Sequence, residues 1–188
     1  MRKTPDVDAS PSPPALDRPA LERKALDYVG RYEAPAARVA AVLRRMVDRA
    51  AQRDSIDRDA ARALIDEVVA DLVTRGIIVD RRYAEIRART LRGRGTATAM
   101  IRQDLRARGV SAAVVSEVLQ GGSDESAANL AAAVALARRR RLGPFRQEAA
   151  RADHRLRDLA ALARRGFDSD TARRVIDAPD VAALEQDD

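Results

Sequence analysis

The residues best placed to do chemistry in this 188-residue sequence are arginines, which gather in two blocks. Residues 81–109 contain nine arginines and two carboxylates, and residues 137–174 contain twelve arginines and five carboxylates. Residues 1–80 are balanced in charge, whereas 110–136 and 175–188 are acidic. Concentrated guanidinium groups bind phosphates or acidic protein surfaces, because neutralising phosphates releases counterions. The charge pattern therefore predicts binding to a polyanion or an acidic partner.

The candidate contacts lie on outer helix faces and in turns. Arg94 lies in a Gly-flanked turn, and residues 138–141 project at one helix end, which is stopped by Gly143 and Pro144. The full set is Arg82, Arg89, Arg92, Arg94, Arg102, Arg106, Arg138, Arg139, Arg140, Arg141 and Arg146. For each of them the alternative is an ordinary solvated helix face. By contrast, Arg108 and Arg165 precede glycines, so we expect them to contact helix C-terminal carbonyls.

Other chemistry is largely excluded by composition. The chain has no Cys and one His, which removes disulfides, thiol nucleophiles and His pairs for zinc. No carboxylate pair lies in a Gly-rich or apolar setting, so we expect no enzyme, cofactor or metal site. The longest apolar run, residues 130–137, is far too short for a membrane helix, and no secretory signal is visible. We expect a cytoplasmic protein that does not bind membranes.

The elements that carry these arginines are predicted to be helices. Hydrophobic residues make up 46% of the chain and aromatic residues 3%, which suits close-packed helices. From Leu21 onward the apolar spacing is helical. Asp57 is expected to cap a helix that Gly76 ends, and Asp80 to cap the next one after a buried connector at residues 77–79. In this second helix the side that carries Ile86 is expected to pack inward.

A repeated segment extends this prediction to the whole fold. Residues 105–111 (LRARGVS) and 162–168 (LARRGFD) match at an offset of 57. In each copy we expect Gly to end one helix, the next residue to pack beneath the turn, and Ser or Asp to cap the following helix. The fold class is therefore all-α, with about three tandem three-helix repeats stacked into an elongated, curved array.

The sequence resembles the RecX family, regulators of the RecA recombinase. The resemblance rests on GIIVDRRYA at 76–84, the spacing Gly95…Ile101…Leu105…Arg108-Gly109-Val110, RRRRLGPFR at 138–146 and Leu162…Gly166-Phe167, and it covers residues 21–178. Two departures are Val79, where a polar or acidic residue is expected, and a first repeat whose middle helix has no Gly turn.

The resemblance implies a non-enzymatic modulator that binds the RecA–DNA filament along its groove and limits recombination, in DNA repair and the SOS response. It also implies binding of single- and double-stranded DNA without strong sequence preference. We expect a monomer. The alternative is a helix-turn-helix transcription factor, which predicts one recognition helix and a dimer on a palindromic site. The predicted organisation is a disordered leader at 1–20, repeats at 21–80, 81–122 and 123–178, and an acidic tail at 179–188.

Overall fold

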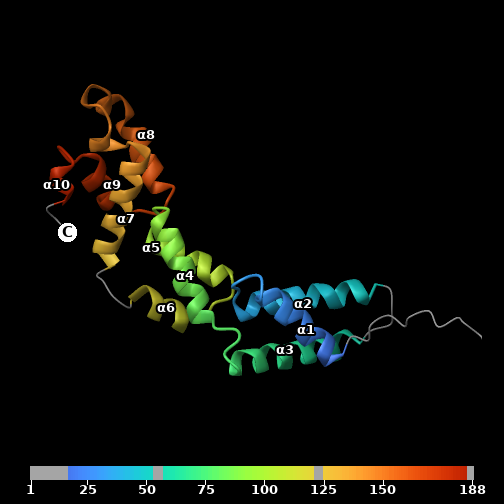
Figure 1. Ribbon diagram of the computed structural model, residues 1–188. Coiled ribbons are helices and arrows are strands. Elements are labelled where there is room, and N and C mark those ends of the chain that lie inside the picture. The colour runs from blue at the N-terminus through green and yellow to red at the C-terminus, as the bar shows by residue number, and fades with distance from the viewer. Residues whose placement is uncertain (1–16, 53–56, 121–124, 186–188) are drawn as a thin grey trace, which may run out of the picture. The chain divides into compact units, whose positions relative to one another are not determined.

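The protein is helical throughout the part that the computed structural model describes, which comprises residues 17–52, 57–120 and 125–185. These residues contain no strand (Figure 1). The all-α fold class is therefore confirmed. None of the described helices is both long and apolar enough to cross a membrane.

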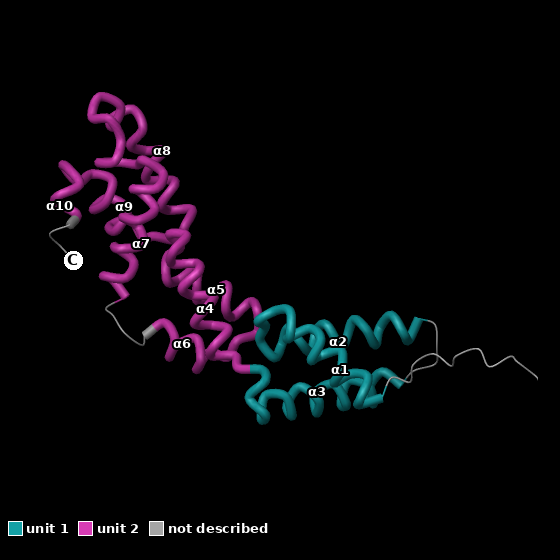
Figure 2. Tube along the Cα trace, in the orientation of Figure 1, with its two compact units in different colours: residues 1–78 teal, residues 79–188 magenta. Residues whose placement is uncertain are grey.

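The chain divides into two compact units, residues 1–78 and residues 79–188 (Figure 2). The helices of the first unit are α1 (Arg18–Val29), α2 (Ala36–Ala50) and α3 (Arg58–Thr74). Those of the second are α4 (Asp80–Gly93), α5 (Thr98–Ala107), α6 (Ala112–Gln120), α7 (Glu125–Arg140), α8 (Arg151–Ala163), α9 (Ser169–Ile176) and α10 (Ala182–Glu185). Two short 3₁₀ turns, η1 (Gly143–Phe145) and η2 (Glu148–Ala150), join α7 to α8.

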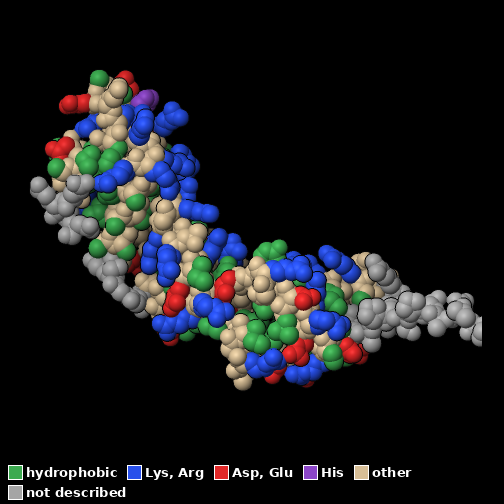
Figure 3. Space-filling model, in the orientation of Figure 1, with side chains coloured by type: hydrophobic (Ala, Val, Ile, Leu, Met, Phe, Trp, Pro, Cys, Tyr) green, Lys and Arg blue, Asp and Glu red, His purple; other side chains and the backbone are tan. Residues whose placement is uncertain are grey.

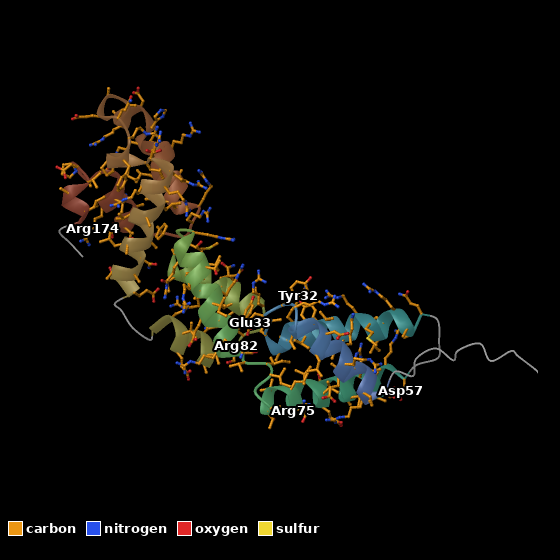
Figure 4. The ribbon with its side chains drawn as sticks, in the orientation of Figure 1. Tyr32, Glu33, Asp57, Arg75, Arg82 and Arg174 are labelled. Carbon is orange, nitrogen blue, oxygen red and sulfur yellow. The ribbon has the colours of Figure 1, made fainter. Side chains whose placement is uncertain are left out.

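The first unit buries an apolar stripe from each of α1, α2 and α3. Leu43 of α2 and Ile65 and Leu72 of α3 are fully buried in one cluster. Asp57 caps α3 by accepting hydrogen bonds from the backbone N–H groups of residues 59 and 60, as predicted. Figure 4 labels Asp57 and Arg75 at opposite ends of α3. Helix formation here therefore follows local apolar spacing and capping.

The first helix, α1, begins within the segment predicted as a leader, residues 1–20. Asp17 accepts a hydrogen bond from the N–H of Ala20 and so caps α1, and Pro19 lies in the first turn, where proline is tolerated. Residues 18–20 are consequently helical. Residues 1–16 lie outside the described residues.

The described residues of the second unit form two apolar clusters. One lies among α4, α5 and α6, and includes Ile101, Leu105 and Val115. The other joins α7, α8 and α9, and includes Leu136 and Leu162. These helices enclose a core of mainly aliphatic side chains, as the composition predicted.

The two copies of the repeated turn have the predicted geometry. Gly109 and Gly166 have φ angles of 83° and 84°, in the left-handed region. Val110 and Phe167 are buried beneath the turns. In each copy the side chain of the next residue, at position 111 or 168, accepts a hydrogen bond from a backbone N–H of the helix that follows.

Two local predictions differ from the structure. Asp80 is the first residue of α4, and Val79 stands at the cap position without a side-chain hydrogen bond. Ile86 is 46% exposed because α4 packs through the small side chains of Ala84 and Ala88. Residues 182–185, which lie within the segment predicted as an acidic tail, form α10, and Leu184 packs into the cluster of α7, α8 and α9.

Candidate nucleic-acid interface

The positive charge of the second unit is partly neutralised within the chain. Arg87 forms two hydrogen bonds with the Asp104 carboxylate, at 2.9 and 3.0 Å, and Arg108 forms a third at 2.9 Å. Chiefly because of the hydrogen bonds from Arg87, the pKa of Asp104 falls from 3.8 to about 2. Arg108 therefore contacts a carboxylate, and the prediction that it binds a helix carbonyl is wrong.

The ends of three basic helices meet at the turn that follows α4. Gly95 has a φ of 64°, and a Cβ atom on it would lie 2.5 Å from the Cβ of Leu136 in α7. The N–H of Ala97 donates to the carbonyl oxygen of Arg165, just after α8, at 3.0 Å. The turn at residues 93–97 is therefore pressed against α7 and tied to the end of α8.

Arg139 joins the two basic segments that the sequence places far apart. Its guanidinium donates to the carbonyl oxygens of Gly93 at 3.0 Å and Arg94 at 2.8 Å. These carbonyls lie at the C-terminal end of α4, where the helix dipole places partial negative charge. The contact brings the end of α7 beside the end of α4, and it gives Arg139 a structural partner.

Two further candidate arginines also have partners within the chain. Arg146 binds the carboxylate of buried Asp158 at 3.0 and 3.3 Å. The guanidinium carbon of Arg138 lies 5.5 Å from the centre of the Phe145 ring, within range of a cation–π contact. Both arginines thus help to hold the segment between α7 and α8.

The remaining candidates have different surroundings. Arg102 pairs with Glu125 at 2.9 Å. Arg92 is half-buried, and its Nε atom is buried without a hydrogen-bond partner. Arg82 is exposed near the start of α4 (Figure 4). Arg106 is exposed in the last turn of α5, at the end of that helix opposite to the turn at 93–97.

We use the name arginine junction for the arginines at the three helix ends that meet at this turn, apart from Arg138 and Arg139, whose partners within the chain are described above. They are Arg89, Arg92 and Arg94 at the end of α4, Arg140 and Arg141 at the end of α7, and Arg164 and Arg165 at the end of α8. Of these, Arg89, Arg94, Arg140, Arg141 and Arg164 are exposed. Within the described part of the chain, no hydrogen bond or ion pair engages the guanidinium groups of these exposed five.

Two members of the arginine junction were missed by sequence reasoning. Arg164 was not singled out, and Arg165 was expected to contact helix carbonyls, but the described residues show no such bond from its guanidinium. In the sequence, the available signal was their position just before Gly166. In the structure, the hydrogen bond from the N–H of Ala97 to the carbonyl oxygen of Arg165 holds the turn at Gly166 beside the start of α5.

The segments that supply the arginine junction carry only positive charge. No Asp or Glu occurs in residues 86–103, 126–147 or 159–167, the segments that supply it. Figure 3 shows Lys and Arg side chains gathered over α8 and over α4 and α5 on the drawn face of the second unit, with some Asp and Glu side chains elsewhere on that unit, and charges of both signs mixed over the first unit. Among the described residues no group of three or more His, Asp or Glu could hold a metal ion. The arrangement is suited to binding an extended anion.

Comparison with known proteins identifies the family. A family model described as RecX, second three-helix domain, matches residues 80–119, which span α4 to α6. Over 159 residues the chain is 42% identical to the protein named Regulatory protein RecX of Myxococcus xanthus (strain DK1622), and the match covers 84% of each chain.

Two solved structures share the fold. The crystal structure of RecX from Lactobacillus salivarius has a TM-score of 0.62 at 21% identity, covering 87% of this chain and 96% of that one. A second structure, described as regulatory protein RecX, has a TM-score of 0.60 at 19% identity, covering 86% of this chain and 72% of that one. The 42% identical relative carries a regulatory and not an enzymatic name. The chain belongs to the RecX family of non-enzymatic regulatory proteins.

Proposed function

We propose that this protein modulates the RecA recombinase by binding the RecA–DNA filament, and that the arginine junction contacts DNA phosphates. Membership of the RecX family supports the modulation of RecA. The observation that supports the DNA contact is the pair of hydrogen bonds from Arg139 to the carbonyl oxygens of Gly93 and Arg94. These bonds join the basic ends of α4 and α7 into one surface. That surface lies in segments without a carboxylate.

Contacts of this kind are independent of base sequence. A guanidinium that binds a phosphate positions a protein on DNA but does not read a base edge. The exposed arginines come from three helix ends and not from one helix lying in a groove, which weighs against the transcription-factor alternative. The protein therefore binds single- and double-stranded DNA with little sequence preference. We further propose that it acts as a monomer.

The direct test measures DNA-dependent ATP hydrolysis by RecA. The purified protein is added to the recombinase of its own organism on single-stranded DNA. Hydrolysis falls as the protein approaches stoichiometric ratios, because the bound protein limits filament growth. Unchanged hydrolysis at stoichiometric ratios would overturn the modulation of RecA.

A pair of variants with the same change in charge tests the DNA contact. Arg94→Ala with Arg140→Ala removes two exposed charges of the arginine junction. Arg44→Ala with Arg62→Ala removes two arginines that form exposed ion pairs in the first unit, at 3.1 Å each. Each phosphate on single-stranded DNA contributes about 0.7 to the slope of log affinity against log salt.

The first variant reduces that slope by up to about 1.4, whereas the second leaves it unchanged. Equal effects of the two variants would mean that net charge, and not the arginine junction, governs binding. A strong preference for one DNA sequence over random DNA would instead favour the transcription factor.

A further inference from the structure

Arg141 has an unusual backbone conformation. With a φ of 56°, it is the only residue other than glycine with a positive φ in the part of the chain that the structure describes. In this region the Cβ atom of an L-residue approaches the following carbonyl oxygen, so glycine is strongly favoured. Arginine at this position is therefore sterically unfavourable.

The same turn occurs five times among the described helix ends, and only here does it lack glycine. After Arg141, the N–H of Leu142 donates to the carbonyl oxygen of Ala137 at 2.9 Å, five residues back. The equivalent bonds after the other turns measure 3.0, 3.1, 3.2 and 3.4 Å. The residues at positive φ in those turns are Gly76, Gly95, Gly109 and Gly166.

The surrounding chain holds the turn in place independently of the Arg141 side chain. Leu142 is buried, and the N–H of Gly143 donates to the carboxylate of Asp158 at 3.0 Å. Arg146 binds the same carboxylate. Disfavoured backbone conformations persist where their surroundings determine them in this way. Glycine would thus satisfy the turn as well as arginine does.

The side chain of Arg141 also has no internal role. It is exposed, and the described residues offer its guanidinium no hydrogen-bond partner. It follows three other arginines, and no carboxylate occurs between residues 126 and 147. Both the backbone and the charge repulsion of its neighbours therefore disfavour arginine here.

The surroundings indicate which anion this arginine fits. Protein–protein interfaces have a largely apolar centre. The exposed large hydrophobic residues of the described chain include none from the segment 138–146. A guanidinium that projects from such a polar segment suits the phosphate oxygens of a nucleic acid, which it can bind through two N–H groups.

We propose that Arg141 is a phosphate-contacting residue, retained in a left-handed turn for its contact with the DNA backbone. This inference rests on the proposed function, because it assigns one contact of the arginine junction. It differs from a stabilising role, in which the cation would interact with the C-terminal end of α7. The two roles predict opposite effects on stability when Arg141 is replaced.

The test compares the variants Arg141→Gly and Arg141→Lys with the wild-type chain. Arg141→Gly raises the melting temperature, by about 2 °C, because glycine relieves the steric conflict. It also reduces the slope of log affinity for single-stranded DNA against log salt by about 0.7. Arg141→Lys retains the charge, and therefore most of the slope.

Two results would overturn the assignment of Arg141. One is an unchanged slope for Arg141→Gly, and the other is a lower melting temperature for that variant. If the slope is unchanged for Arg141→Gly but falls for Arg94→Ala with Arg140→Ala, only this assignment fails. If the wild-type chain itself does not bind DNA, the proposed DNA contact fails and the assignment fails with it.

Discussion

Arg146 binds Asp158 through two hydrogen bonds, from Nε to Oδ2 at 3.3 Å and from Nη2 to Oδ1 at 3.0 Å. The Asp158 residue is only 2% exposed, and its carboxylate also accepts the N–H of Gly143. One buried carboxylate thus ties the segment after α7 to α8. Arg146 was expected to bind a polyanion, but this geometry gives it a partner inside the protein.

Replacing Arg146 by Ala should strongly destabilise the fold. The change leaves the Asp158 carboxylate buried without its cation, which costs about 3 kcal/mol in the free energy of unfolding. Urea denaturation measures this loss. Arg106→Ala is the control, since Arg106 is exposed and its effect should stay within about 0.5 kcal/mol. Similar losses for the two variants would show that the buried pair has no special role.

Replacing either of two adjacent arginines of α7 should affect different properties, the stability of the fold in one case and DNA binding in the other. Arg139→Ala removes the hydrogen bonds to the carbonyl oxygens of Gly93 and Arg94, and should lower the free energy of unfolding by about 1–2 kcal/mol. Arg140→Ala should leave stability unchanged and weaken binding to single-stranded DNA. Denaturation and a DNA titration at low salt measure the two effects. The same stability loss in both variants would contradict the difference in their roles.

Two glycines at helix ends should tolerate alanine differently. Gly76 and Gly95 have similar φ angles, 69° and 64°. Because alanine disfavours this backbone conformation, it should lower the free energy of unfolding by about 1 kcal/mol at either position. A Cβ atom on Gly76 meets no atom within 4 Å, whereas on Gly95 it would lie 2.5 Å from the Cβ of Leu136. Gly95→Ala should therefore cost about 1–3 kcal/mol more than Gly76→Ala. Equal melting temperatures would mean that the turn after α4 is not pressed against α7.

Asp104 should make stability depend on acid pH. Because its pKa is about 2 in the folded chain, below the ordinary value of 3.8, its ionised form stabilises the fold. This contribution, of about 2 kcal/mol, is complete above about pH 4 and is lost as the pH falls through about 2. Unfolding free energies of the wild type and Asp104→Asn should differ most at neutral pH and converge near pH 2. A difference that stays constant with pH would contradict this role of the carboxylate.

The helices and their turns could be predicted from the sequence because the determinants are local. The apolar spacing of α3, the cap at Asp57 and the repeated glycines at 109 and 166 each act within about one helical turn. The same local signals, with the motifs around Gly76 and Gly109, led to the RecX family. The exposed Ile86 was mispredicted, because only the packing of α4 shows that small alanines form its buried side.

The partners of the arginines depended on the tertiary structure. A long guanidinium side chain reaches whichever backbone or carboxylate the fold brings near it, and no spacing in the sequence specifies that group. Arg139 contacts residues 45 and 46 positions earlier, and Arg146 a carboxylate on the next helix, whereas Arg140 and Arg141 between them stay exposed. The sequence alone therefore determined that the chain is helical and carries concentrated positive charge. Only the packing of α4, α7 and α8 decided which of those charges support the fold and which face outward.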